Sequence, residues 1–289
     1  MSVANSVPIL QQIFHPSDFT PASEVAFIHA LKAALIAKAE LTILHVSPKH
    51  ESEWMEFPGV RTTLERWGLL PKNSTQSDVA KKLGIRIKKV QAKHNDPVES
   101  VTAYLSAHNT DMIVLATDQQ KGPVQWLSQS IAAPIARKSN QMTLFIPKGV
   151  DGFVSAPDGS VLLTSILVPI AETPTPEPAV HAAARMAIRL NLPSGIFTLL
   201  HVGESTGMPN VRLPEVSGWQ WNRVVKPGDV VDVISDTASA VKAGLIVVTT
   251  EGRHGFLDAL RGSHSEQILR QAPCPLLAIP ASSFMASVV

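Results

Sequence analysis

Hydrophobic and polar positions along the chain follow two patterns that alternate. Continuous apolar runs such as Leu41–Val46 and Met112–Ala116 are typical of strands buried on both faces of a sheet. Between such runs, apolar residues recur at helical spacing, as in Val25–Leu35, where the pair Thr20-Pro21 predicts the helix start. Strands that alternate with helices indicate βαβ units and therefore a parallel sheet.

The same pattern extends through both halves of the chain. In the first half we expect strands at Ile9–Phe14, Leu41–Val46, Ile85–Val90, Met112–Ala116 and Thr143–Pro147, and further helices at Pro97–His108 and Ser130–Ser139. In the second half we expect strands at Ile166–Pro169, Phe197–Val202, Leu245–Thr249 and Leu276–Pro280, and helices at Pro178–Leu190 and Ser263–Gln271. Each half thus predicts an open, doubly wound α/β sheet, a fold that binds ligands outside the carboxyl ends of its strands.

An internal repeat links the two halves. Segments 116–147 and 249–280 align without a gap, and Ser130 falls on Ser263. A repeat fixes how many units must fold and which face each of them presents. It also makes each half a natural control for the other, because a residue required by the scaffold should occur in both copies.

The chain length agrees with two domains. At roughly 150 residues per domain, 289 residues predict domains at 1–150 and 151–289. The junction Lys148–Thr164 contains Asp158-Gly159 between two short apolar segments, which predicts a hairpin. We therefore expect the junction to be ordered in part.

Composition and charge narrow the class of protein. The net charge of +1 gives no reason to expect a nucleic acid or a membrane as partner. No apolar run approaches the ~20 residues that span a bilayer, and the first residues lack the pattern of a secretory signal. The only cysteine is Cys274, so a disulfide within the chain is excluded and a cytoplasmic protein is expected. Cys274 lies between two prolines before an apolar strand, where a buried, inert thiol is expected.

Two insertions carry most of the tryptophans. Pro48–Gly84 in the first half contains Trp54 and Trp67, and Gly203–Trp221 in the second half ends with Trp219 and Trp221. Spaced aromatic residues in loops either form a binding surface or anchor the loop on the core. Anchoring is the commoner role, and both interpretations stay open at this point.

Several short motifs, in order and duplicated, carry a resemblance to a known family. They are the turn His15–Pro21 after the first strand, the strand ends Leu44–Val46 and Leu200–Val202, and the glycine loop Glu251–Gly255 followed by Gly262-Ser263. In these motifs the chain resembles a tandem universal stress protein, with two such domains in one polypeptide, over nearly its whole length.

The resemblance implies a specific architecture. It implies two doubly wound, five-stranded parallel-sheet domains of the Rossmann-like kind found in HUP and adenine nucleotide alpha hydrolase-like proteins. These would pack as an intrachain pseudo-dimer through their last strands, Thr143–Pro147 and Leu276–Pro280. Pairing of these short apolar strands is physically sensible because it covers edges that would otherwise be exposed.

The resemblance also implies a candidate nucleotide site. One kind of family member binds ATP through a loop of the form Gly-x2-Gly-x9-Gly-Ser/Thr and an Asp after the first strand, and another kind has lost the site. Glycines let backbone N–H groups approach phosphates, and a helix N-terminus adds a favourable dipole. The matching positions in the second half are Val202, Gly252, Arg253, His254, Gly255, Gly262, Ser263 and His264, and those in the first half are Asp18, Val46, Gly122 and Ser130.

The second-half site departs from the ATP-binding pattern in two ways. Six residues separate Gly255 from Gly262, three fewer than in the ATP-binding kind, and Ala171 stands at the position of Asp18. Ser263 also has a purely structural explanation, because Ser263 and Glu266 form a capping box. A small anion such as phosphate at Ser263 fits this half better than a whole ATP.

The first-half site departs in the complementary way. It keeps Asp18, but Gln119 and Gln129 replace two of the glycines, and their side chains would crowd the phosphate cradle. Its loop, from Gly122 to Ser130, is as short as that of the second half. The histidines show no convincing metal-ligand spacing, so no metal and no catalytic residue is expected. For His45 and His201, which recur at strand ends, a backbone or packing role is expected rather than catalysis.

Three functions follow from this comparison. The first is a universal stress response protein that acts as a non-enzymatic sensor or regulator with degenerate nucleotide sites. The second is an ATP-binding switch, with Mg-ATP as cofactor and slow hydrolysis, that uses the second-half glycine loop. The third is a structural protein–protein interaction module. A homo-oligomer and unidentified protein partners are compatible with all three.

Overall fold

The computed structural model describes residues 10–47, 58–93, 96–117, 135–136, 139–250 and 272–282. The first half comprises β1 (Gln12–Pro16), α1 (Pro21–Ala37), β2 (Glu40–Ser47), α2 (Val60–Arg66), α3 (Gln76–Leu83), β3 (Arg86–Lys93), α4 (Pro97–Ala107), β4 (Met112–Thr117) and β5 (Met142–Pro147). The second half comprises β6 (Ser165–Ile170), α6 (Glu177–Arg189), β7 (Gly195–Val202), the 3-10 turn η2 (Ser205–Gly207), β8 (Trp219–Lys226), α7 (Val230–Ala240), β9 (Leu245–Thr250) and β10 (Leu276–Pro280).

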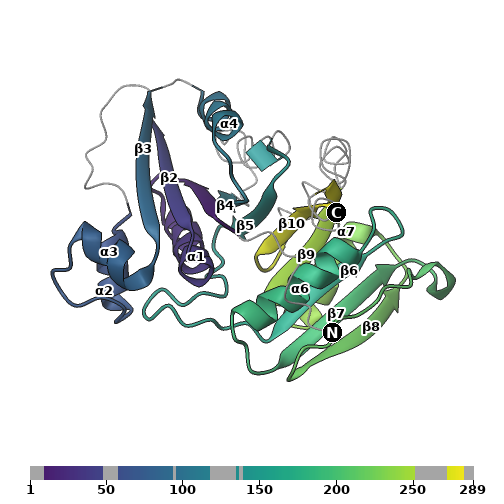
Figure 1. Ribbon diagram of the computed structural model, residues 1–289. Helices are drawn as coiled ribbons and strands as arrows, with labels where there is room; N and C mark the ends of the chain where they lie inside the picture. Colours follow the sequence, from purple (N-terminus) through teal and green to yellow (C-terminus); the bar gives the residue numbers. More distant parts are fainter. Residues whose placement is uncertain are drawn as a thin grey trace.

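The ten strands of the described part of the chain belong to one sheet. Its order is β3-β2-β1-β4-β5-β10-β9-β6-β7-β8, so each half has the doubly wound order with its first strand in the middle (Figure 1). Neighbouring strands within each half are parallel. The predicted α/β fold with two five-stranded parallel units is therefore confirmed, and the carboxyl ends of β1 and β6 mark the switch points in strand order.

The two units meet through their last strands. β5 and β10 pair antiparallel, and the central pair of the register joins Leu144 to Leu277. In the internal repeat these two leucines are equivalent positions. A pseudo-twofold axis therefore passes between them, as expected for a self-complementary interface, and the intrachain pseudo-dimer is confirmed.

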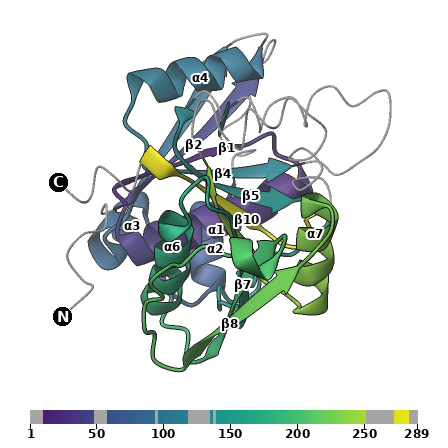
Figure 2. The ribbon, with the colours of Figure 1, turned by 90° about the vertical axis from the view of Figure 1, so that its right-hand side faces the viewer.

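Helices cover both faces of the sheet. One apolar cluster joins α1, α2, α3 and α6 to one face and runs through both halves without a break. A second cluster joins α4 and α7 to the opposite face, and Figure 2 shows these two helices away from α1 and α6. The continuity of the first cluster makes the interface between the halves part of the core.

Capping residues set where the main helices begin. Thr20 caps α1 by accepting a hydrogen bond from the Ser23 N–H at 3.3 Å, as the Thr20-Pro21 pair predicts. Asp96 and Asp229 do the same for α4 and α7, each accepting two backbone N–H groups. The expected helix at Ser130–Ser139 lies largely outside the described residues, and the one at Ser263–Gln271 lies entirely outside them.

The second insertion differs from the expectation of a loop. Trp219 and Trp221 do not lie in a loop, because they open the edge strand β8, and the helix α7 follows it. β8 lacks a continuous apolar run, since Gln220 and Asn222 alternate with its tryptophans. Gln220 and Asn222 are exposed, so one face of β8 is open to solvent there and its tryptophans occupy only alternate positions.

The junction between the halves forms the predicted hairpin. Val154 and Val161 make an antiparallel bridge, and Asp158 accepts the backbone N–H of Ser160 at 3.0 Å. The hairpin packs on the first half. There the indole N–H of Trp67 donates to the carbonyl of Ala156 at 3.0 Å, so the connection is a fixed element.

Candidate functional site

A buried polar chain lies beneath the carboxyl end of β1. The Nδ1–H of His15 donates to the Val114 carbonyl at 3.0 Å, which leaves Nε2 to face the Ser23 hydroxyl at 3.5 Å. Ser23 in turn donates to the hydroxyl of Ser17 at 3.0 Å. Burial lowers the pKa of His15 to about 4, so the ring is neutral. The chain ties β1, α1 and β4 together and has no access to a substrate, which gives it a structural role.

Asp18 follows β1, where the resemblance puts the nucleoside-binding acid. Its exposed carboxylate accepts the Thr20 N–H at 3.0 Å and the Thr20 hydroxyl at 2.7 Å through the same oxygen. This is the Asx-turn geometry by which aspartate stabilises a tight turn. The carboxylate thus braces the turn that leads into the Thr20 cap of α1.

An aromatic stack covers the ends of β1 and β2 in the first half. The Phe19 ring lies on the His45 ring with centroids 3.9 Å apart and an interplanar angle of 16°. Phe19 has a φ of 61°, an uncommon backbone conformation for a bulky residue. His45 Nδ1–H donates to the Ser17 carbonyl at 2.7 Å, and Val46 follows as a half-buried residue. Phe19 was not among the predicted site residues.

The second half repeats the histidine contact without the acid or the stack. His201 Nδ1 lies 3.4 Å from the carbonyl of Ile170, the position equivalent to Ser17, and the next residue is Ala171. Val202 is half-buried, like Val46 in the first half. Both strand-end histidines therefore join neighbouring strands through a backbone carbonyl, which agrees with the predicted backbone role.

The glycine loops follow β4 and β9. These strands end at the equivalent residues Thr117 and Thr250, both buried. The Thr117 carbonyl accepts the Lys148 N–H at 2.7 Å, while the Thr117 hydroxyl has no hydrogen-bond partner within the described part of the chain. Thr117 is a polar group at the site that the sequence reasoning missed. The candidates that lie outside the described residues are Gly122, Ser130, Gly252, Arg253, His254, Gly255, Gly262, Ser263 and His264.

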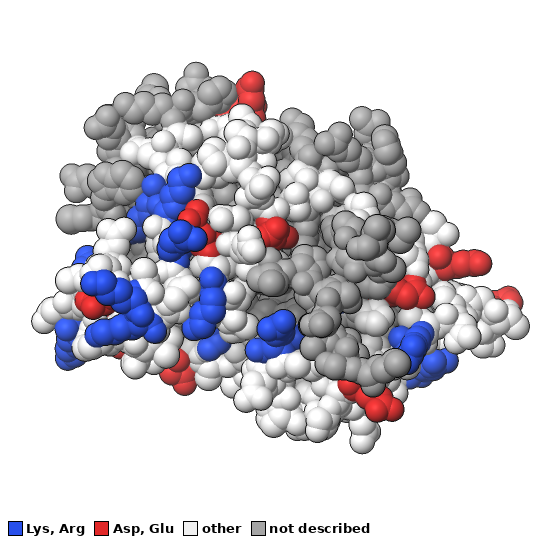
Figure 3. Space-filling view, viewed as in Figure 1, with Lys and Arg blue, Asp and Glu red and all other residues white. Residues whose placement is uncertain are grey.

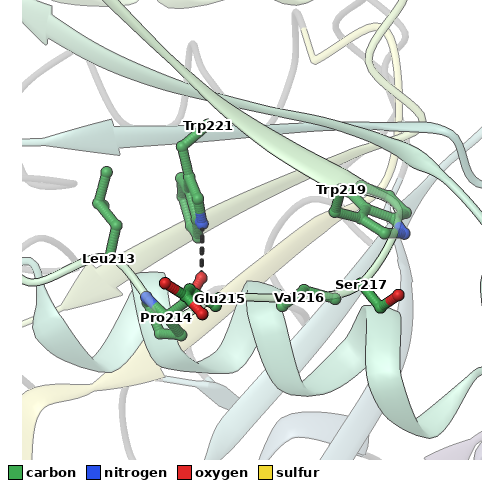
Figure 4. A pocket seen from close by; sticks show the side chains of 7 residues that line it. All are labelled: Leu213, Pro214, Glu215, Val216, Ser217, Trp219 and Trp221. Carbon is green, nitrogen blue, oxygen red and sulfur yellow. Dashed lines mark hydrogen bonds between the residues drawn. The ribbon is translucent and has the colours of Figure 1, made fainter.

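A hollow of about 650 Å³ lies beside β8 in the second half (Figure 4). Its lining consists of residues 213–217 with Trp219 and Trp221. The indole N–H of Trp221 donates to the Pro214 carbonyl at 2.9 Å, and that of Trp219 donates to the Leu192 carbonyl at 3.2 Å. The Trp221 indole stacks on Phe197 with centroids 4.2 Å apart, and the Trp219 indole contacts the same ring in a tilted arrangement at 4.4 Å. The tryptophans thus anchor the loop on the core, and neither has an N–H left for a ligand.

The described residues bear on metal ligation, thiol reactivity and membrane spanning. Among the described residues, no three His, Cys, Asp or Glu side chains come close enough to hold a metal ion. Burial raises the pKa of the Cys274 thiol to about 12, which confirms the predicted inert residue. Within the same described ranges, none of the helices has the length and apolar character needed to cross a bilayer.

Comparison with known proteins shows which family the sequence matches. The universal stress protein family model matches residues 10–147 and 220–280. A solved universal stress protein from Archaeoglobus fulgidus DSM 4304 superposes with a TM-score of 0.57 at 15% identity, over 93% of this chain and 98% of that chain. A putative universal stress protein from Pseudomonas aeruginosa UCBPP-PA14 gives 0.57 at 12% identity, over 97% and 98%. At such identities the two structures show a shared fold. A search of curated proteins found no match.

Proposed function

Since this chain belongs to the universal stress protein family, we propose that it is a non-enzymatic regulator of a stress response with degenerate nucleotide sites. The observation that carries the proposal is the state of the first-half site, where the groups that would meet a nucleoside already bind one another. Asp18 braces its own turn, and Phe19 stacks on His45.

A nucleoside in the first half would have to replace these contacts. One oxygen of the Asp18 carboxylate already accepts two hydrogen bonds from Thr20, so a ribose hydroxyl would have to use the other oxygen or compete with Thr20. A base that approached Val46 would meet the Phe19 ring, whose stack on His45 contributes about 1 kcal/mol. Gln119 and Gln129 add bulk where the phosphates would lie.

The second half lacks parts of the nucleotide site other than those that the first half lacks. Ala171 offers no carboxylate, and the segment from Gly255 to Gly262 is three residues shorter than the ATP-binding pattern. A phosphate group has support in this half from the glycines and from Ser263, whereas the nucleoside has none from Ala171. We therefore expect a small anion at most in the second half. A cytoplasmic setting fits the buried, reduced Cys274.

Titration calorimetry with Mg-ATP tests the proposal directly. We expect no binding heat and no rise in melting temperature at millimolar ligand, and no phosphate release above a blank. A one-site isotherm with a matching rise in melting temperature would overturn the proposal.

Two variants identify which feature blocks each half. Phe19→Asn removes the ring and keeps a residue that tolerates a positive φ, and Gln119→Gly with Gln129→Gly clears the phosphate cradle. Because the first-half loop is as short as the second-half loop, this triple variant should still give no binding of Mg-ATP, and binding would show that side-chain bulk rather than loop length blocks the first half. Ala171→Asp restores the acid in the second half, and it should give no binding because the loop remains short. Binding by Ala171→Asp alone would show that the short loop is no obstacle.

The ATP switch and the interaction module remain as alternatives with their own readouts. If the unaltered protein binds Mg-ATP and Gly262→Val abolishes the binding, the second-half loop is a switch. The module hypothesis predicts that Trp219→Ala with Trp221→Ala abolishes partner binding without loss of stability. The burial of Trp219 and its bond to Leu192 favour a loss of stability instead.

A further inference from the structure

The chain has a small net charge, but its positive and negative residues are unevenly distributed along the sequence. Residues 58–93, which form α2, α3 and β3, contain nine Lys and Arg but only two Asp and Glu, a net charge of +7. Since the whole chain carries +1, all other residues together carry −6. Uneven charge of this size creates a local field that the net charge does not reveal.

The positive side chains gather on one part of the molecule. Figure 3 shows Lys and Arg over α2, α3 and β3. The exposed residues of the α2–α3 unit, which we term the basic face, are Arg61, Arg66, Lys72, Lys81 and Lys82. On β3, burial and then the charge of Arg61 lower the pKa of Lys89, which indicates that positive charges crowd here.

The two acids within this segment are committed to local structure. Glu65 accepts the backbone N–H of Ser74 at 3.1 Å. Asp78 forms the capping box of α3 with Thr75, and these bonds lower its carboxyl pKa. Its contact with Lys82 is loose, at 3.9 Å. The basic face therefore keeps most of its charge for a partner.

The repeat shows that the scaffold does not require this charge. The equivalent segment of the second half, residues 203–226, contains three Lys and Arg and two Asp and Glu, a net charge of +1. Lysines on an edge strand such as β3 protect it from pairing with other chains. That explanation does not apply to Arg66 on α2, Lys72 in the α2–α3 turn or Lys81 on α3.

An exposed leucine stands within the basic face. Leu69 lies in the α2–α3 turn between Arg66 and Lys72 with 42% of its surface exposed, whereas the adjacent Leu70 is buried. Anionic lipid headgroups attract clustered basic residues, and an apolar side chain at the same place can enter the interface. We propose that the basic face with Leu69 is a docking surface for an anionic lipid membrane.

A nucleic acid would require a different surface. Sites for single strands combine positive charge with exposed aromatic rings that stack on bases. The aromatic residue of the α2–α3 unit, Trp67, is buried and its N–H is bonded to Ala156. An exposed leucine between Arg66 and Lys72 suits a lipid interface better than a phosphate backbone.

Vesicle co-sedimentation of the full chain tests this proposal. The probes are phosphatidylcholine vesicles with and without about 30% phosphatidylserine, at about 50 and about 300 mM NaCl. We expect binding to the anionic vesicles alone, with a several-fold loss at the higher salt concentration. Equal binding to both vesicle types, or none to either, would overturn the proposal.

Matched variants locate the surface. Arg66→Gln, Lys72→Gln and Lys81→Gln together should weaken partitioning on the order of 100-fold, at about fivefold per neutralised residue. The control Arg189→Gln, Arg212→Gln and Arg223→Gln removes the same charge from exposed second-half positions and should change it little. Equal losses in both triple variants would refute a localised surface.

Two further measurements separate lipid from other partners. Leu69→Ser leaves every charge in place and should weaken vesicle binding about tenfold without lowering the melting temperature. Unchanged binding by Leu69→Ser would refute its insertion. Tighter binding to a short DNA duplex than to anionic vesicles at the same salt concentration would reassign the basic face to nucleic acid.

Discussion

His29 offers the sharpest test of how the two halves are joined. It lies buried on α1, where its Nδ1–H donates to the Val25 carbonyl at 2.8 Å. Its Nε2 accepts the backbone N–H groups of Phe153 at 3.0 Å and Val154 at 3.3 Å. Gly152 lies so close, at a φ of 75°, that a Cβ there would be 2.2 Å from the His29 ring. One side chain therefore holds the junction hairpin against the first half.

Replacement of His29 by Phe keeps most of the volume and removes the acceptor. Two buried N–H groups then lose their partner, at about 1–3 kcal/mol each. We expect the free energy of unfolding to fall by about 2–6 kcal/mol in urea titrations followed by tryptophan fluorescence. The matched control is His108→Phe. That exposed histidine also bonds the carbonyl four residues earlier but holds no other segment, so we expect a change within about 0.5 kcal/mol.

The pH dependence gives a second readout of the same contact. Burial lowers the pKa of His29 from 6.5 to about 4, so as pH falls the unfolded chain takes up the proton first. Stability is thus complete above pH 6.5 and falls between pH 6.5 and about 4, by about 1.4 kcal/mol per pH unit or about 3 kcal/mol in all. His15 adds a similar slope. His29→Phe should remove about half of the combined slope. A loss below about 1 kcal/mol at pH 7 with an unchanged slope would refute the reasoning.

Three further predictions follow from the packing. Gly195→Ala should destabilise the second half by about 2–3 kcal/mol in urea titrations, because its Cβ would lie 2.5 Å from the Trp219 ring and 2.6 Å from the Thr164 carbonyl oxygen; Gly68→Ala meets no atom within 4 Å and should cost only about 1 kcal/mol, from its left-handed φ of 69°. Leu144→Lys places a charge at the centre of the β5–β10 pairing, so small-angle scattering should show a larger radius of gyration while circular dichroism keeps the helical signal. An unchanged radius would contradict the central role of this pair. Cys274 should resist iodoacetamide at pH 8 in the folded protein and react once it is unfolded in urea, since its thiol pKa is about 12; rapid alkylation of the folded chain would contradict its burial.

The strands and the pairing of the halves could be predicted because they depend on local patterns. Leu41–Val46 and Met112–Ala116 are continuous apolar runs, and central parallel strands require such runs. The repeat also predicted how the two halves pair, because Leu144 and Leu277 are equivalent positions in it and these two residues form the centre of the β5–β10 register. β8 escaped prediction because one of its faces is exposed, so its apolar residues alternate with polar ones.

The details of the candidate site could not be predicted in the same way. The stack of Phe19 on His45 depends on a positive φ and on the register of two strands, neither of which a residue pattern encodes. The contact of His29 with Phe153 joins residues 124 positions apart. The unpartnered hydroxyl of Thr117 depends on how tightly β4 is enclosed. Such features arise from tertiary packing.

The β5–β10 pairing has a consequence for how the two halves evolve. In a symmetric homodimer every substitution appears in both subunits, so a change that favours one role is imposed on both copies. Here the junction hairpin and the strand pairing hold two non-identical halves at a fixed one-to-one ratio and a high effective concentration. A substitution in one half is therefore not repeated in the other, so the two halves can differ in their surfaces and sites. The first half carries a cationic outer surface, and the second half carries more of the glycines that match the ATP-binding pattern, so the chain is a heterodimer encoded in one polypeptide.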